Sequence, residues 1–137
     1  MASTFSISEM VSLALHSIVI IAGQNGQLVN VKKIAKKIGA SEAHLAKALQ
    51  QLVKGGYINS VRGPKGGFTL AKSPENIILM DIYELFEGPI KIDGCPMNCQ
   101  VCAFKSCILG EVPKKLNQEF INYMTNRKVS DFLEDIK

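Results

Sequence analysis

Four cysteines stand within 13 consecutive residues in the C-terminal half of a 137-residue chain. Their spacing is Cys-x3-Cys-x2-Cys-x4-Cys, from Cys95 through Cys99 and Cys102 to Cys107. Thiolates are soft ligands that suit zinc and iron–sulfur clusters. Structural zinc sites commonly use two separated Cys-x-x-Cys pairs, whereas this run is compact and contains one such pair. The pattern therefore favours an iron–sulfur cluster, with zinc, redox-active thiols or structural thiols as alternatives.

The cellular compartment decides whether clustered thiols indicate a metal or disulfides. The longest unbroken apolar run, Ile18 to Ala22, is far shorter than the ~18 residues that a membrane span needs. The N-terminus has no basic segment before an apolar stretch and no small-residue cleavage site, so a secretory signal is not expected. We therefore expect a soluble, cytoplasmic protein with no membrane partner, in which the thiols bind a metal rather than pair with each other.

The positive charge of the chain is concentrated in one block. The whole sequence has a formal charge of +4, with 16 Lys+Arg against 12 Asp+Glu. Residues 31–73 contain nine basic side chains and one acid, Glu42, a net of +8, and the remaining residues sum to −4. A basic block on a folded domain is typical of a protein that binds a polyanion, although a solvated lysine face gives the same pattern.

The basic block has the order of a winged helix-turn-helix. Apolar residues at three- and four-residue steps predict short helices over residues 31–38 and 42–54. They are joined by a turn in which Ser41 can cap the second helix. Two β-branched or aromatic runs, 57–61 and 68–71, flank a Gly/Pro turn and predict a hairpin. A hairpin directly after a helix-turn-helix is a wing.

A winged helix-turn-helix places its second helix in the major groove of DNA and its wing near the minor groove. Lysines on the two helices suit phosphate contacts, and His44 and Lys47 can reach base edges or phosphates. A merely exposed His44 is the alternative, and the wing turn is alternatively a plain turn. A phosphate-binding loop is a weaker alternative, because the Gly-x-x-x-x-Gly-Lys-Ser/Thr pattern is missing. The candidate DNA-binding residues are Lys32, Lys36, Ser41, Ala43, His44, Lys47, Lys54, Arg62, Gly63, Pro64, Lys65, Gly66 and Gly67.

Helical periodicity also appears on both sides of the basic block. It predicts a first helix over residues 8–22 and a further helix over 77–87, which Gly88-Pro89 ends. Residues 88–111 have no clean period and contain all the cysteines. A helix over 113–126 and a short turn over 130–136, with Ser130 as its cap, complete the chain. The expected apolar face of the helix over 113–126 consists of Leu116, Phe120, Tyr123 and Met124.

Several short motifs point to a known family. The stretch from Ser60 to Ala71, SVRGPKGGFTLA, is similar to the wing signature of the Rrf2 (Rrf-two) family of bacterial winged helix-turn-helix regulators. Asp81-Ile82, Glu87-Gly88 and Leu13-Ala14-Leu15 also match. Together with the order of the elements, these motifs make almost the whole chain resemble that family, whose members include IscR, NsrR and CymR.

The resemblance has implications for the cysteines. Cluster-bearing members use three cysteines and a variable fourth ligand, with the first and last cysteine twelve residues apart, as Cys95 and Cys107 are. The middle cysteine of the family would fall at Val101, and two family positions for a fourth ligand hold Gly110 and Ser12 here. The hypothesis is therefore that all four cysteines of one subunit hold a 4Fe–4S or 2Fe–2S cluster.

The sequence thus predicts a mainly α-helical protein with a small β-hairpin. The expected parts are a winged helix-turn-helix DNA-binding domain over 1–88, a cysteine-rich sensor loop over 89–111, and a dimerisation helix with a C-terminal tail over 112–137. The resemblance implies a homodimer in which the helix over 113–126 crosses to the partner. The expected function is transcriptional regulation, with affinity for double-stranded operator DNA controlled by the cluster. The alternative is a winged-helix regulator with structural zinc or no metal, controlled by thiol oxidation or a protein partner. No catalytic residue set appears, so we expect neither an enzyme nor a small-molecule substrate.

Overall fold

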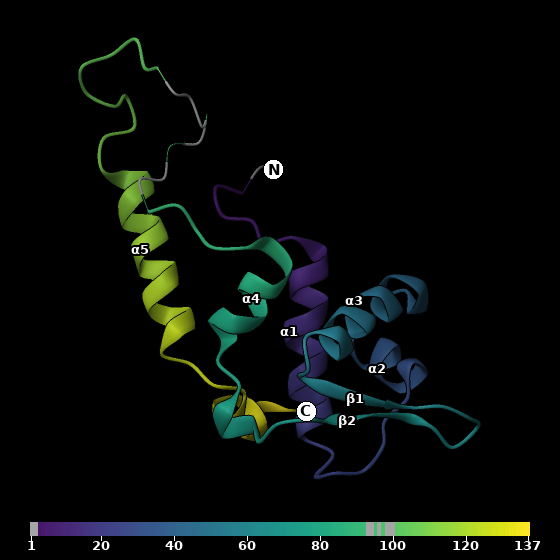
Figure 1. The fold of residues 1–137 in the computed structure, drawn as a ribbon. Helices are drawn as coiled ribbons and strands as arrows, with labels where there is room; N and C mark the ends of the chain where they lie inside the picture. The colour runs from purple at the N-terminus through teal and green to yellow at the C-terminus, as the bar shows by residue number, and fades with distance from the viewer. Residues whose placement is uncertain (1–2, 93–94, 96, 98–100) are drawn as a thin grey trace.

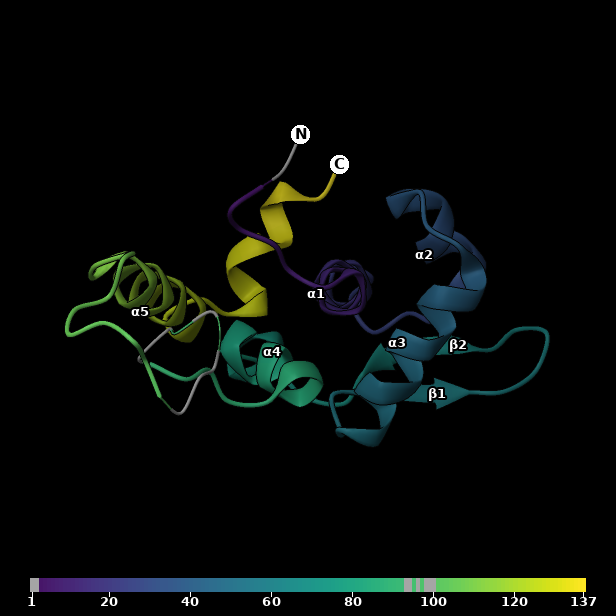
Figure 2. The same ribbon diagram turned by 90° about the horizontal axis from the view of Figure 1, so that it is seen from above.

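The computed structural model describes residues 3–92, 95, 97 and 101–137 (Figure 1). The central element is helix α1, and in the view along its axis it separates two groups of elements (Figure 2). Helices α2 and α3 and the hairpin β1–β2 lie on one side, and α4 and α5 lie on the other. The elements are α1 (Glu9–Ala22), α2 (Val31–Ile38), α3 (Glu42–Lys54), β1 (Ile58–Val61), β2 (Gly67–Leu70), the 3-10 helix η1 (Pro74–Asn76), α4 (Leu79–Glu87), α5 (Val112–Thr125) and the 3-10 helix η2 (Val129–Asp135).

Helix α1 provides the middle of the hydrophobic core. Ser8 caps it, because its hydroxyl accepts a hydrogen bond from the Val11 N–H at 3.2 Å. Val11, Ala14 and Ile18 have no exposed surface, and each fully buried aliphatic side chain of valine or isoleucine size contributes about 1.5–3 kcal/mol. Since α1 contacts α3, α4 and η2, it fixes the elements on its two sides relative to each other.

Helices α2 and α3 form the helix-turn-helix. Asn30 caps α2 through the Lys33 N–H, and Ser41 caps α3 through the His44 N–H. Between them, Gly39 takes a φ of 68°, a left-handed conformation that ends α2 and costs glycine little. The residues that α3 turns into the core are fully buried: Leu45, Ala48, Leu49 and Leu52. This packing leaves the opposite face of α3 in solvent.

The wing is a two-stranded antiparallel hairpin that is anchored to the chain before α2. Its register runs from Ile58 opposite Leu70 to Val61 opposite Gly67. Val29 pairs with Phe68 through two backbone hydrogen bonds of 2.8 and 3.2 Å. A Cβ atom at Gly67 would lie 2.6 Å from the Val29 carbonyl oxygen, so this close approach requires glycine.

Helices α4 and α5 contact each other midway along their lengths and are joined again at one end. Midway, the Tyr83 and Phe120 rings pack edge to face with centroids 5.1 Å apart. At the joined end, the Leu79 N–H donates to the Arg127 carbonyl oxygen at 3.0 Å. The Val129 N–H donates to the Ile77 carbonyl oxygen at 2.9 Å. No helix among residues 3–92, 95, 97 and 101–137 is long and apolar enough to cross a bilayer.

The structure confirms the expected fold class and its elements, with four differences. The helix expected from residue 77 begins at Leu79, because the backbone of Ile77 and Ile78 pairs with the chain around Lys128. The N-cap of the last turn is Lys128 rather than Ser130, and the Lys128 N–H donates to the Asp131 carboxylate at 2.9 Å.

The third difference concerns the apolar face of α5. Met124 is buried and Phe120 is half-buried, but Leu116 and Tyr123 keep 53% and 48% of their surface exposed. The 3-10 helix η1 was not expected from the sequence. The expected division into parts at residues 88 and 111 stays a prediction.

Candidate nucleic-acid interface and cysteine loop

The exposed face of α3 presents the residues that the sequence nominated for base contacts. Ser41, Ala43, His44 and Lys47 are all exposed in the first half of the helix, and Lys54 is exposed at its far end. Their positions follow from the buried face described above, because residues three and four apart share a side of a helix. The Ser41 cap and the first two turns of α3 therefore offer a hydroxyl, an imidazole and one long cation to a ligand, beside the exposed carboxylate of Glu42.

His44 has a contact that sequence reasoning missed. Its Nδ1 atom lies 3.6 Å from Oε1 of Glu9, the first residue of α1. The two side chains remain 57% and 72% exposed, so the contact is a surface pair of small energy. No local sequence signal could have found it, because 35 positions separate the residues and only the packing of α1 on α3 brings them together.

The candidate phosphate-binding lysines on α2, Lys32 and Lys36, are exposed on the side opposite the buried Ile34 and Ala35. A further lysine, Lys72, follows the end of β2, and its Nζ atom lies 4.6 Å from the centroid of the Tyr57 ring. Burial raises the pKa of the Tyr57 phenol, and the negative charges of Asp81 and Glu84 raise it further. This phenol therefore stays neutral at physiological pH.

The tip of the wing is open to solvent. Arg62, Gly63, Pro64 and Lys65 are exposed, and the turn is closed by a 2.9 Å hydrogen bond from the Gly66 N–H to the Gly63 carbonyl oxygen. Gly66 and Gly67, the other two glycines among the candidate DNA-binding residues, stand where the fold leaves no room for a side chain. A Cβ at Gly66 would collide with the Val61 carbonyl oxygen, and Gly67 is buried against Val29.

The cysteine-bearing segment connects α4 to α5 and lies far from the wing (Figure 1). Cys95, Cys102 and Cys107 are exposed, and Cys99 lies outside the described residues. Within the described part of the chain, no three His, Cys, Asp or Glu side chains come together as a metal site. The donor chemistry of four thiols fits a soft metal or cluster, whereas the described geometry does not assemble one.

The cysteine-bearing segment and the first half of α5 carry many large apolar side chains that are exposed to solvent. Exposed apolar surface that is contiguous generally marks an interaction site. Those with half or more of their surface exposed are Ile92, Met97, Val101, Phe104, Ile108, Leu109, Val112 and Leu116.

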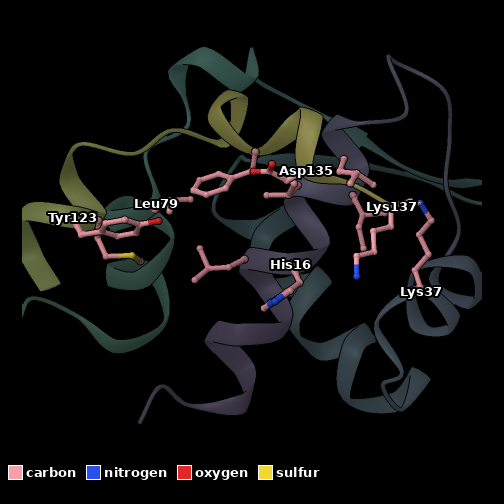
Figure 3. A pocket seen from close by; sticks show the side chains of 12 residues that line it. His16, Lys37, Leu79, Tyr123, Asp135 and Lys137 are labelled. Carbon is pink, nitrogen blue, oxygen red and sulfur yellow. Dashed lines mark hydrogen bonds between the residues drawn. The ribbon is translucent and has the colours of Figure 1, made fainter. Parts of the chain in front are cut away.

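A cavity of about 460 Å³ lies between α1, the end of α5 and the C-terminal segment (Figure 3). Its lining is mainly apolar and includes Leu79 and Tyr123, with His16, Lys37 and Asp135 among its polar groups. The His16 Nδ1 atom is 2.6 Å from the Ser12 carbonyl oxygen, which orients the ring along its own helix. No serine or cysteine of the described residues lines the cavity.

Comparison with known proteins gives a consistent result. The family model described as Rrf2, an iron-dependent transcriptional regulator, matches residues 7–135. A protein of Aquifex aeolicus (strain VF5), named "Putative HTH-type transcriptional regulator", is 33% identical over 129 residues, which cover 92% of this chain and 90% of that protein.

Solved structures agree in fold. The chain is similar to CymR, the global cysteine regulator of B. subtilis, with a TM-score of 0.77 and 22% identity over 98% of this chain and 100% of that one. It is also similar to T. potens IscR, with a TM-score of 0.73 and 26% identity over 98% of this chain and 90% of that one. The match of the family model over nearly the whole length, with the winged helix and its basic face in place, shows that the chain belongs to the Rrf2 family of transcriptional regulators.

Proposed function

We propose that this transcriptional regulator binds operator DNA as a homodimer and that an iron–sulfur cluster in its cysteine loop controls the affinity. As an Rrf2-family regulator it is not an enzyme. The observation that carries the proposal is the spatial division of the molecule. The basic helix-turn-helix and wing lie on one side of α1, and residues 101–111, which include Cys102 and Cys107, lie on the other side with α4 and α5 (Figures 1 and 2). Because the cysteine segment and the DNA-binding face are separated, the helices between them must transmit any change in the cluster.

The proposed DNA contacts follow from exposure and charge. The first half of α3, with Ser41, Ala43, His44 and Lys47, enters the major groove. The hairpin tip reaches the adjacent minor groove through Arg62 and Lys65, next to Pro64 and Gly63, and the glycine lets the backbone approach closely. Phosphate contacts, which set position rather than sequence preference, come from Lys32, Lys36 and Lys54.

The proposed homodimer follows from the apolar surface that α5 leaves uncovered. Val112, Leu116 and Tyr123 are 57%, 53% and 48% exposed on this helix. A second copy of the helix would bury these side chains. The dimer would then present two recognition helices, which places the half-sites about 34–36 Å apart or a multiple of that distance.

The proposed cluster is 4Fe–4S or 2Fe–2S, held by Cys95, Cys99, Cys102 and Cys107. Such a cluster would supply sensitivity to oxygen or nitric oxide. The support is the donor chemistry of four thiols within 13 residues, together with a family model described as iron-dependent. Each thiolate bond would restrain the backbone between α4 and α5, so the loaded and empty states would hold these two helices differently.

The test begins with protein purified without oxygen. We expect a brown protein with broad visible absorbance, containing iron and acid-labile sulfide. Bound fragments are then selected from genomic DNA, and the affinities of cluster-loaded and metal-free protein are compared on them. A coupling of ~1–3 kcal/mol predicts a difference of roughly 5–150-fold. Equal binding by both forms to every selected fragment contradicts the proposed control.

A pair of variants locates the control in the cysteine run. Cys107→Ser is expected to lose the visible absorbance and the affinity difference. Ser106→Ala, which changes the exposed neighbouring residue, is expected to retain both. If Cys107→Ser keeps a full complement of iron, this cysteine is not a ligand.

A second candidate function is that of a winged-helix regulator with structural zinc or no metal, controlled by thiol oxidation or by a protein partner. The exposure of Cys102 and Cys107 favours it, because reactive cysteines are accessible to solvent. One similar solved structure is described as the oxidised form of Staphylococcus aureus CymR, at 24% identity and a TM-score of 0.71. Colourless anaerobic protein with stoichiometric zinc, or colourless protein whose DNA affinity changes on oxidation, supports this alternative over the cluster.

A further inference from the structure

The last turn of helix α4 contacts the C-terminal end of the recognition helix α3. The side-chain amide of Gln51 donates a hydrogen bond from Nε2 to the Leu85 carbonyl oxygen at 3.1 Å. Directly beside it, Leu85 packs against Gly55, where a Cβ would lie 2.8 Å from the Leu85 Cδ2 atom. A polar bond and an apolar contact therefore hold the end of α3 to the last turn of α4.

The sequence explains why the Leu85 carbonyl is available. In a continuing helix this oxygen would accept from the N–H four residues later. That residue is Pro89, which has no N–H, and the chain leaves the helix at Gly88 with a φ of 78°. The preceding carbonyl, of Glu84, accepts from the Gly88 N–H at 2.9 Å. Gln51 thus supplies the donor that the proline removes.

This contact lies between the two functional parts of the molecule. On α3, Gln51 is two helical turns from His44, about 10 Å along the axis. On α4, Leu85 is three residues before Gly88, where the cysteine-bearing segment begins. Two residues earlier on α4, Tyr83 packs against Phe120 of α5. Helix α4 therefore touches the recognition helix, leads into the cysteine segment and packs on α5.

We propose that the Gln51–Leu85 hydrogen bond couples the state of the cysteine loop to the orientation of the recognition helix, which makes Gln51 a positioning residue. This inference rests on the proposed function. A change in the loop acts on Gly88 and Pro89 and displaces the last turn of α4. Because α3 is a rigid helix joined to that turn by Gln51, its first half moves relative to the DNA. Without the bond, α4 can shift while α3 stays in place.

The experiment compares wild type and four variants by the ratio of their operator affinities in two states. One state is metal-free, and the other is reconstituted anaerobically with ferrous iron and sulfide. The variants at the contact are Gln51→Ala, Gln51→Glu, which keeps the size but loses the donor, and Gln51→Lys, which keeps a donor at similar reach. Gln50→Ala is the matched control, because Gln50 is exposed on the same helix. A ratio cancels the uniform effect that a changed charge has on DNA affinity.

We expect wild type and Gln50→Ala to share one ratio within the roughly 5–150-fold range of allosteric coupling. Gln51→Ala and Gln51→Glu are expected to bring the ratio to within about 2-fold of one, with melting temperatures near that of wild type, and Gln51→Lys to restore most of it. If all folded Gln51 variants retain the wild-type ratio, this inference is overturned and the proposed function stands. A wild-type ratio of one overturns both.

A second measurement uses metal-free protein alone. In solution NMR, the side-chain amide protons of Gln51 are expected to exchange with solvent more slowly than those of Gln50, because the former are bonded at a half-buried site. Equal exchange at the two residues contradicts the hydrogen bond itself, whatever the cysteines bind.

Discussion

Arg62 is exposed to solvent at the tip of the wing. Because its guanidinium can enter a narrow minor groove, we expect Arg62→Ala to weaken operator binding by about 1–3 kcal/mol, or roughly 5–150-fold. The matched control is Arg127→Ala, whose guanidinium stacks on Tyr123 at 5.1 Å, and light scattering checks that this variant keeps the wild-type mass, because Tyr123 lies on the proposed dimer face. Fluorescence anisotropy with operator DNA measures both, and an unchanged affinity for Arg62→Ala refutes the assignment of the wing.

Lys36 is expected to act through phosphate, without sequence preference. Lys36→Ala should weaken binding to operator and to random DNA by the same factor. It should also reduce the slope of log affinity against log salt by about 0.9 for each phosphate that is no longer neutralised. Lys115→Ala, at an exposed lysine of α5, serves as the control. A weakening confined to the operator would mean that Lys36 reads bases.

Glu9 places a negative charge 3.6 Å from His44 on the proposed DNA-binding face. Removing that charge reduces repulsion from phosphate and releases the imidazole, so Glu9→Gln is expected to tighten operator binding about 2–5-fold at low salt. Glu134→Gln, at an exposed acid of η2, is the control. Weaker binding by Glu9→Gln would show instead that the carboxylate holds His44 in its DNA-binding orientation.

At the scale of elements, local patterns predicted α2, α3 and the hairpin closely, because caps, turn glycines and apolar spacing act within a few residues. The predicted start of α4 was wrong because it depends on pairing between Ile78 and Lys128. The predicted cap of η2 was wrong because the Lys128 N–H donates to the Asp131 carboxylate and the turn begins one residue earlier than expected. The contacts of Gln51 with Leu85 and of Glu9 with His44 join residues 34 and 35 positions apart. Only tertiary packing creates such pairs, so periodicity could not reveal them.

The wing depends on Gly67. We expect Gly67→Ala to lower the free energy of unfolding by about 2 kcal/mol or more, on the order of an overpacked core site, because the new Cβ would lie 2.6 Å from the Val29 carbonyl oxygen. Gly26→Ala is the control, since Gly26 has a φ of 87° but nothing within 4 Å. It isolates the backbone strain of about 1 kcal/mol. Urea unfolding gives both values, and equal changes would exclude the steric contribution.

At the scale of the whole molecule, DNA affinity should depend on the joining of two copies. Leu116→Glu introduces a charge into the exposed apolar face of α5 and is expected to yield a monomer. Loss of the second half-site should then lower operator affinity on the order of 10²-fold. Gln118→Glu adds the same charge at an exposed polar position of the same helix and should leave the dimer intact. Light scattering measures the mass, and a dimeric Leu116→Glu protein contradicts this interface.

The backbone hydrogen bonds that join Leu79 to Arg127 and Ile77 to Val129 hold the two ends of one long chain segment side by side. This segment contains α4, the cysteines and α5. The chain segment from α4 to α5 therefore begins and ends at one place next to the winged helix, and within it α4 also packs on α1 and contacts α3 through Gln51. An insertion or deletion between these two ends leaves the hydrogen bonds that join them in place. Residues 88–111 can therefore change in length while α4 keeps its packing on α1, which makes this loop the natural place for grafting a different sensor onto the same DNA-binding half.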